Sequence, residues 1–423
     1  MLRENGIKRG MVRRGDHKVS IVNKVLLTWL LPVVLLPAGC GDGGEGGGVG
    51  GGGGPLGGGS GTTSILYVAN RDSDNVSGYS INTTSGILAA IPGSPFSNVS
   101  GPSAMAVSSN GFFAYVTNSR TNNVTAFRVS TEGALLLVPP TPAIPNPAAV
   151  DAAPGAVAIS PDTKHLYVVN LGPDTVTAFN IETAGALTLI PSAGGNTNPV
   201  AVNGADPASI AIVQSGKFLY VANSGSNDVT AFSIGATGLL SRIAPSGANA
   251  NPISTGGTVP KGVAISPNGS FLYVANSGSD NLTVFQIGAN GLLTLVPPTG
   301  SNTNPAPVGG TTPNALMFSL DSRFLYSVNG GGNVSVFTIG SDGLLTLVPN
   351  SAGNLNPVSA GTNPIALTMS PDGRFLYVAN QGGGVSAYTI NTETGTLAPL
   401  TALVGNPFPT GTTPSAIATP GRP

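Results

Sequence analysis

Residues 370–380 read SPDGRFLYVAN, a turn followed by a short stretch of β-strand. Pro and Gly at its second and fourth positions favour a β-turn, and the apolar and aromatic residues after them favour a strand. Close variants recur along the chain at intervals of 48 to 53 residues. Their final residues are Asn70, Asn118, Asn170, Asn223, Asn276, Asn329 and Asn380. Such a period predicts a fold built from repeated units.

Each repeat contains four stretches that favour β-strands. The first follows a proline, as in residues 260–266, and the second is the FLYVAN run. The third carries the pattern VTxF and the fourth the pattern GxLxxV, as at residues 291–296. Turn residues separate the four stretches. Four short strands per repeat are typical of a β-propeller blade rather than of a helical solenoid.

The two ends of the repeat array complement each other. The array begins at a second strand, residues 65–70, and it ends after a lone first strand, residues 414–419. Both fragments would expose unpaired strand edges if they stayed apart. The sequence therefore predicts an all-β, seven-bladed propeller over residues 64–423, in which the C-terminal strand completes the N-terminal blade and closes the ring.

Composition excludes several classes of function. Of the 423 residues, 61 are Gly, 36 are Pro and only 8% are charged, which favours a turn-rich β protein over a helical bundle. Seven of the 17 Lys and Arg residues precede residue 41, so the body is mildly acidic and lacks the basic face that nucleic-acid binding needs. One Cys and two His residues exclude a disulfide framework and a Cys-based zinc site, and we expect no cofactor and no metal.

The first 63 residues have the composition of an export and anchoring segment. A basic stretch precedes the apolar run Val25–Leu36, after which small residues lead to Cys40. This order resembles a bacterial lipoprotein signal peptide, so residues 1–40 are predicted to be a leader with Cys40 as the lipidation site. Residues 41–63 are predicted to be a Gly-rich flexible tether. We expect an exported protein that contacts the membrane only through this lipid. The outer membrane is mildly preferred.

The repeat itself resembles a known family. The SPDGxFLYVAN core, repeated seven times, is similar to the YVTN-repeat and lactonase-like seven-bladed propellers, which include the propeller type of 6-phosphogluconolactonase. The resemblance covers residues 64–419. It implies the propeller fold and raises lactone-ring hydrolysis as an activity, although propellers host unrelated functions.

Candidate site residues gather in the loops of one predicted face. If the first strands line the central channel, the loops before them and after the second strands open together at the channel mouth. The cations expected there are Arg71, Arg120 and Lys261, and Asp72 and Asp206 are candidate general bases. Lactone hydrolysis needs an activated water and a group that stabilises the oxyanion, so these five are the candidate catalytic residues.

Other polar positions have structural interpretations. The repeat asparagines are expected to cap turns through their side chains, and Asp74, Asp174, Asp228 and Asp280 to be Asx-turn residues rather than calcium ligands. His165 stands where most repeats have Phe and is expected to be a sheet position. The connections of about 15 residues between repeats are expected to cover the upper face as an interaction surface or a lid.

Three functions remain open on these grounds. The first is a lipid-anchored envelope module that binds a protein or a carbohydrate, which the scarcity of titratable residues at the predicted mouth favours. The second is a lactone-ring hydrolase that takes a small lactone at the channel mouth, which the family resemblance implies. The third is a structural module of a surface layer or an adhesion protein.

Overall fold

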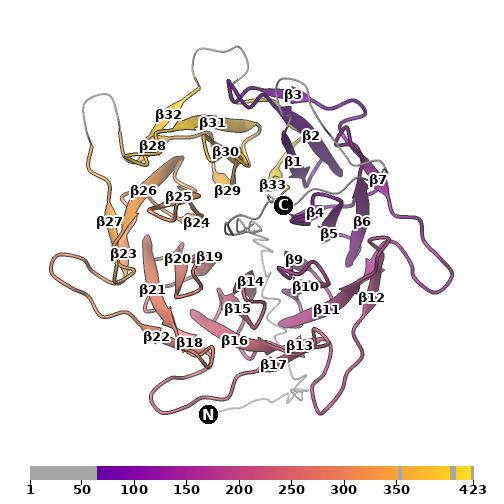
Figure 1. The fold of residues 1–423 in the computed structure, drawn as a ribbon, viewed down its shortest axis with the longest axis horizontal. Coiled ribbons are helices and arrows are strands. Elements are labelled where there is room, and N and C mark those ends of the chain that lie inside the picture. The colour runs from indigo at the N-terminus through magenta and orange to yellow at the C-terminus, as the bar shows by residue number, and fades with distance from the viewer. Residues whose placement is uncertain (1–63, 351–354, 401–405, 421–423) are drawn as a thin grey trace, which may run out of the picture.

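A computed structural model describes residues 64–350, 355–400 and 406–420. The predicted leader, Cys40 and the Gly-rich segment lie outside these residues. The described chain folds into seven antiparallel sheets arranged as blades around a central axis (Figure 1). The prediction of an all-β, seven-bladed propeller is confirmed. None of the described residues forms a helix long and apolar enough to cross a bilayer.

Each blade has four main strands, numbered here from the channel outward. The first, or inner, strands are β4 (Pro102–Val107), β9 (Pro154–Ile159), β14 (Pro207–Ile212), β19 (Pro260–Ile265), β24 (Pro313–Phe318), β29 (Pro364–Met369) and β33 (Pro414–Ala418). The second strands are β1 (Ser64–Asn70), β5 (Phe113–Asn118), β10 (His165–Asn170), β15 (Phe218–Asn223), β20 (Phe271–Asn276), β25 (Phe324–Asn329) and β30 (Phe375–Asn380).

The third and fourth strands form the outer half of each blade. The third strands are β2 (Asn75–Ile81), β6 (Asn123–Val129), β11 (Thr175–Ile181), β16 (Asp228–Ile234), β21 (Asn281–Ile287), β26 (Asn333–Ile339) and β31 (Val385–Ile390). The fourth strands are β3 (Leu88–Ala90), β7 (Leu135–Leu137), β12 (Leu187–Leu189), β17 (Leu240–Arg242), β22 (Leu293–Leu295), β27 (Leu345–Leu347) and β32 (Leu397–Pro399).

The C-terminal strand closes the ring as the sequence predicts. β33 pairs with β1, with Tyr67 opposite Ala418 and Ala69 opposite Ala416, so blade 1 contains both ends of the array. Its residues Ala416, Ile417 and Ala418 are fully buried. Blades 2 to 7 then follow in chain order from β4 to β32.

The apolar core lies between the blades rather than within them. Seven hydrophobic clusters each join residues of two neighbouring blades, including blades 7 and 1. The repeat tyrosine of each second strand is fully buried, and its hydroxyl donates a hydrogen bond to a glycine carbonyl of the next blade. The Tyr220 to Gly291 bond is 2.8 Å long and the Tyr377 to Gly86 bond, at the closure, is 2.9 Å long. Packing and these bonds hold the blades together.

The connections between blades were predicted to cover the upper face of the ring. This prediction is wrong for the first half of the connections, between the fourth strand and the loop tip. The tips at residues 193–196, 246–249 and 299–302 fold back as short bridges and project from the outer rim (Figure 1). Asn196 at one tip bonds Ser241 of the next blade at 2.7 Å. These contacts cover the exposed edges of the outer strands. Five connections also add a two-residue strand to the third strand, namely β8 (Ala148–Ala149), β13 (Val200–Ala201), β18 (Ile253–Ser254), β23 (Ala306–Pro307) and β28 (Val358–Ser359).

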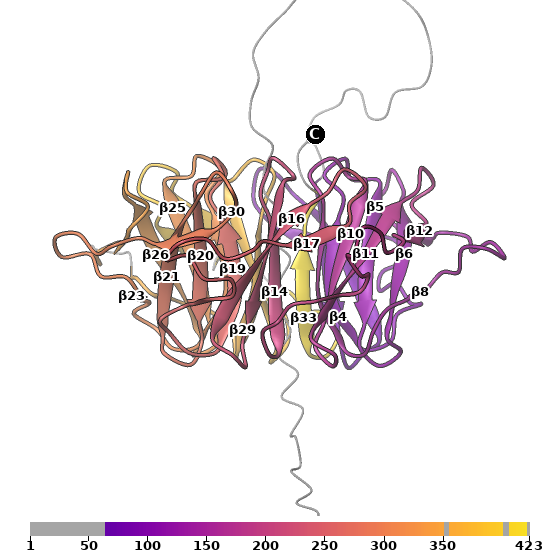
Figure 2. The same ribbon diagram turned by 90° about the horizontal axis from the view of Figure 1, so that it is seen from below.

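The two faces of the ring have different loops. The mouth face carries the ends of the second strands and the starts of the inner strands, whereas the turn face carries the SPDG-type turns that join them. β1 starts and β33 ends at the turn face, towards which the β33 arrow points in Figure 2. Both ends of the described propeller therefore lie away from the mouth face.

Candidate functional site

A β-bulge marks the start of every inner strand at the mouth face. In blade 5, Pro260 pairs with Asn276 and Gly262 with Ala275, so Lys261 is the extra residue of the bulge. The bulged residues around the ring are Ser103, Gly155, Ala208, Lys261, Asn314, Ile365 and Ser415. Bulges redirect side chains, and of these seven residues Lys261 alone is not buried, so it is the bulged residue that reaches the mouth.

Three bulged residues connect neighbouring blades. Ser103 donates a hydrogen bond to the Pro154 carbonyl at 2.6 Å, and Ser415 donates one to Pro102 at 2.7 Å. Asn314 donates through Nδ2 to the Pro364 carbonyl at 2.9 Å. These three side chains are buried and satisfied, so they brace the mouth rather than react there.

Lys261 is the ionisable residue of the inner strands. Among the seven described inner strands, it alone carries a charged or imidazole side chain. Its Nζ lies 3.4 Å from Oδ1 of Asn314, and the side chain is half-buried. Burial lowers the pKa of Lys261 to about 8, because desolvation disfavours the ammonium form. At neutral to mildly alkaline pH this lysine is available both as an ammonium and as a free amine.

Uncharged polar side chains continue the lining from blade 5 to blade 7. They converge on Gly330, where a Cβ would lie 2.5 Å from Oγ1 of Thr312, 3.0 Å from Nδ2 of Asn314 and 3.1 Å from Oδ1 of Asn363. Asn363 in turn donates to the Gln381 side chain. Lys261, Thr312, Asn314, Asn363 and Gln381 therefore form one connected group, which we call the polar arc. Its accessible members, Thr312, Asn363 and Gln381, can bind the hydroxyl groups of a ligand, while the buried Asn314 contacts Lys261 and the Pro364 carbonyl.

Arg71, Asp72 and Arg120 come together where blades 1 and 2 meet. Arg120 forms an ion pair of 3.0 Å with Asp72 and a second ion pair with Asp74. About half of each side chain in the Arg120–Asp72 pair is exposed, at 44% and 53%, so we expect the pair to stabilise the fold little. Partial burial lowers the pKa of Arg71; the Asp72 carboxylate acts to raise it and the Arg120 charge to lower it. Arg71, being more buried than Arg120, is the cation of this group that is built into the mouth.

The remaining predicted residue, Asp206, lies in blade 4 on the same face. Its side chain is exposed, and its backbone N–H donates to Oδ1 of Asp174 at 2.8 Å. The five predicted residues thus occupy one face but three places: Arg71, Asp72 and Arg120 together, Asp206 in blade 4 and Lys261 in blade 5. The polar-arc residues Thr312, Asn314, Asn363 and Gln381 lie at positions that the repeat also places on this face, although they were not among the five candidate catalytic residues. The convergence of the first three on Gly330 and the bond from Asn363 to Gln381 show that they form one group.

The repeat asparagines bridge the turns after their strands as predicted, but the prediction of Asx turns is wrong for the loop carboxylates Asp174 and Asp280, which bond the neighbouring blade. Asn223 is fully buried and donates through Nδ2 to Asp228 and Thr230 at 2.6 and 2.9 Å. Asp174 and Asp280 each accept the N–H of the residue before the next blade's proline, at 2.8 and 2.6 Å. Within the described ranges, no three His, Cys, Asp or Glu side chains gather closely enough to hold a metal ion.

Comparison with known families agrees with this architecture. The family model described as "Lactonase, 7-bladed beta-propeller" matches residues 60–196, 192–308 and 298–416. The chain belongs to this lactonase family. The match covers all seven blades up to residue 416 in β33, and it includes every residue of the polar arc and of the Arg71 group. A comparison with curated proteins found no match.

Solved structures similar to this lactonase-family propeller share its fold at low sequence identity. The periplasmic gluconolactonase of Pseudomonas aeruginosa is 20% identical with a TM-score of 0.65, over 86% of this chain and 100% of that chain. A proposed 6-phosphogluconolactonase of Bacteroides fragilis is also 20% identical with a TM-score of 0.65, over 84% and 98% of the two chains. At this identity the likeness establishes the fold.

Proposed function

We propose that this lactonase-family propeller hydrolyses a sugar-derived lactone at its mouth face. The observation that carries the proposal is Lys261, a half-buried lysine with a pKa of about 8 at a bulge of the channel wall. The family and the names of the two structural neighbours support the reaction class. The amides of the polar arc suit a polyhydroxylated substrate beside that lysine.

In the proposed reaction, the free amine of Lys261 acts as the general base. It takes a proton from water while the water oxygen bonds to the lactone carbonyl carbon. The tetrahedral intermediate then expels the ring oxygen, which takes the proton back from the Lys261 ammonium. The ester bond is broken, the product is the open-chain hydroxy acid, and Lys261 returns to its neutral form. Arg71 is proposed to bind an anionic or carbonyl oxygen of the substrate.

A screen of sugar lactones, with and without phosphate, tests the proposal on the full-length protein. We expect K261R to lower kcat/KM by about 100-fold or more, because arginine keeps the charge but stays protonated. K217Q, which removes an exposed lysine at the turn face, should leave the rate unchanged. Turnover that survives in K261R would show that Lys261 is not the base.

A second candidate is a binding module that does not turn its ligand over. The observation in its favour is that Arg120 holds the carboxylates of Asp72 and Asp74 in ion pairs, which suits a bracing role for these two groups better than a general-base role. An envelope protein or a carbohydrate would then occupy the polar arc. Binding of a gluconolactone analogue that K261R weakens, with no hydrolysis of any lactone, would favour this candidate over the hydrolase.

We also propose that the chain is exported and anchored to the cell envelope through a lipid on Cys40. The order of basic residues, apolar run and cysteine in the sequence supports this proposal. Since β1 starts at the turn face, a segment carrying the anchor would join the propeller on the side opposite the mouth. Incorporation of a radiolabelled fatty acid that disappears in C40S would support the anchor, and equal labelling of both proteins would refute it.

A further inference from the structure

Two equivalent pockets on the turn face differ in their chemistry. Each has a volume of about 300 Å³ and lies between neighbouring blades, one between blades 3 and 4 and the other between blades 4 and 5. Ile234, Gly235 and Ala236 line the first, and Ile287, Gly288 and Ala289 occupy the same places in the second. Only the first also has a carboxylate and an imidazole in its lining. We call it the His165 pocket.

His165 has an imidazole at a position where five other blades have a phenylalanine. At the equivalent position, Phe113, Phe218, Phe271, Phe324 and Phe375 start their second strands. Each of these rings packs on a glycine of the next blade, and His165 packs in the same way on Gly238, where a Cβ would lie 2.4 Å from Nδ1. That nitrogen is buried without a hydrogen-bond partner within the described chain. Because five other blades have Phe at this position, the fold does not require an imidazole there.

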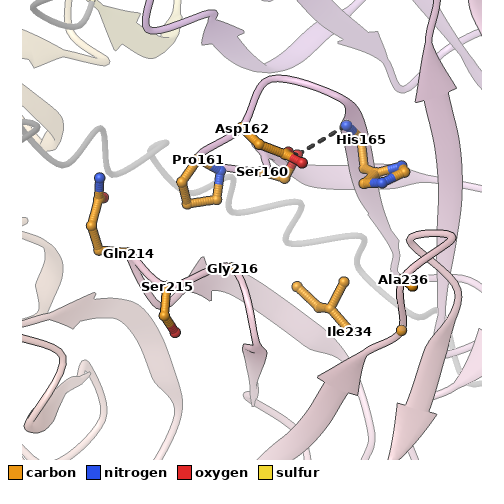
Figure 3. A pocket seen from close by; sticks show the side chains of 10 residues that line it. Ser160, Pro161, Asp162, His165, Gln214, Ser215, Gly216, Ile234 and Ala236 are labelled. Atoms are coloured by element: carbon orange, nitrogen blue, oxygen red, sulfur yellow. Dashed lines mark hydrogen bonds between the residues drawn. The ribbon is translucent and has the colours of Figure 1, made fainter.

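The other polar groups of the pocket come from both blades (Figure 3). Asp162 lies on the blade 3 turn, and Gln214 and Ser215 lie on the blade 4 turn. Partial burial acts to raise the pKa of Asp162, but hydrogen bonds from Ser160 and from the Lys164 N–H outweigh it and keep the pKa below its ordinary value. The pocket therefore offers a charged acceptor, an amide and a hydroxyl opposite an apolar wall that includes Ile234.

Charge selects the kind of ligand that fits. The Asp162 carboxylate disfavours an anion in the pocket. Lys164, whose Nζ lies 3.9 Å from Oδ2 of Asp162, offsets that charge and so disfavours a cation. Burial lowers the pKa of His165, while Asp162 and Asn180 act to raise it and Lys164 to lower it, so the ring stays neutral near pH 7. A neutral ligand with several hydroxyl groups matches these donors and acceptors.

We propose that the His165 pocket is a second ligand site, separate from the channel mouth, that binds a neutral saccharide of about one ring. Its volume of about 300 Å³ is at the lower end for small-molecule sites, which suits a single ring rather than an oligomer. Asp162, Gln214 and Ser215 bind the hydroxyl groups, and Ile234 packs on the apolar face of the ring. The His165 ring lines the same pocket where other blades have a phenyl ring, and its Nδ1 is buried against Gly238.

Titration calorimetry on the full-length protein tests this site with named probes. Methyl glucoside, galactose and N-acetylglucosamine are the neutral probes, and gluconate and glucosamine are the charged ones. We expect at least one neutral sugar to bind with one site per chain and both charged probes to bind at least tenfold more weakly. H165F installs the residue of five other blades and should weaken binding at least tenfold.

Two matched variants separate the pocket from general effects. D162N removes the charge but keeps an acceptor at a position where Asn110 and Asn268 stand in blades 2 and 5, and it should weaken binding at least tenfold. D372N makes the same change in blade 7, where Asp372 accepts the equivalent 2.6 Å bond from Ser370, and it should bind like the wild type. K261R should also leave binding unchanged.

The proposal has clear failures. It is overturned if none of the neutral sugars binds, or if H165F and D162N bind as tightly as the wild type. It is also overturned if K261R abolishes sugar binding, because the ligand would then occupy the channel mouth. None of these outcomes depends on lactone hydrolysis, so the site can stand or fall apart from the proposed enzymatic function.

Discussion

The interfaces between blades share one contact in every repeat, whereas the bulged positions of the inner strands carry different residues. All seven interfaces contain the same contact, a buried tyrosine hydroxyl bonded to a glycine carbonyl of the next blade, at 2.6 to 3.1 Å. The seven bulged positions, by contrast, carry six different residue types, from Gly155 to Lys261. Interfaces must fit neighbours of identical shape, whereas Lys261, the one bulged residue that is not buried, can reach solvent at the mouth. Function is therefore expected where the repeat is irregular.

The largest effect is expected from breaking the pairing of β33 with β1, which joins the two ends of the described propeller within blade 1. A chain ending at residue 413 lacks β33 and leaves the inner edge of β1 unpaired, together with the apolar surfaces that Ala416, Ile417 and Ala418 cover. We expect it to lose its cooperative thermal transition and to aggregate in size-exclusion chromatography. I417V keeps the strand and should remain a folded monomer-sized species. A soluble, cooperative truncated protein would contradict closure by β33.

The next largest effect is expected on the rate of lactone hydrolysis, at the bulged residue Lys261. If its free amine is the base, log kcat/KM for lactone hydrolysis should rise with pH and level off above about pH 8, the pKa of Lys261. A pH–rate profile of the wild type and K261R measures this, and the K261R profile should be low without that inflection. A wild-type rate that instead falls above pH 8 would assign the ammonium form, and hence anion binding, to Lys261.

Because the interfaces between blades are uniform, the same substitution should lower stability equally at different interfaces. Y220F, inside the array, and Y377F, at the closure, each leave a buried glycine carbonyl without its donor. Each should lower the free energy of unfolding by about 1 to 3 kcal/mol in urea titrations. Equal losses would show that the closure is equivalent to the other joints. A loss confined to Y220F would show that blades 7 and 1 are joined mainly by β33.

The smallest effect is expected at His165, an irregular residue inside a uniform interface. Burial lowers its folded-state pKa below 6.5, so between the two pKa values the unfolded chain binds more protons and stability falls as pH decreases. H165F removes this dependence and an unpaired nitrogen, and should be about 1 kcal/mol more stable at pH 8. Its advantage should widen as pH falls from 6.5 to 5 in matched thermal unfolding curves. A constant difference would refute the assignment.

Most of the fold followed from local pattern. The ring, its closure and the turn-bridging role of asparagines such as Asn223 follow from the seven asparagine-ended strands, the turns before them and the complementary ends. The role of Asp280 did not follow, because it bonds the N–H of Thr312 in the next blade. The first halves of the connections were placed wrongly, because contacts such as the hydrogen bond of Asn196 to Ser241 depend on a neighbouring blade. Composition alone does not show on which side of a blade a loop packs.

The site was predicted in part. The sequence determined that Arg71, Asp72, Arg120, Asp206 and Lys261 lie in loops and strand starts of a single face, because the repeat fixes the strand direction at each position. Only the tertiary structure decided that Arg120 pairs with Asp72, that Lys261 is desolvated beside Asn314, and that amides converge on Gly330. Those facts depend on contacts between blades about 50 residues apart in the chain, and a repeat period carries no information on which side chains meet across them.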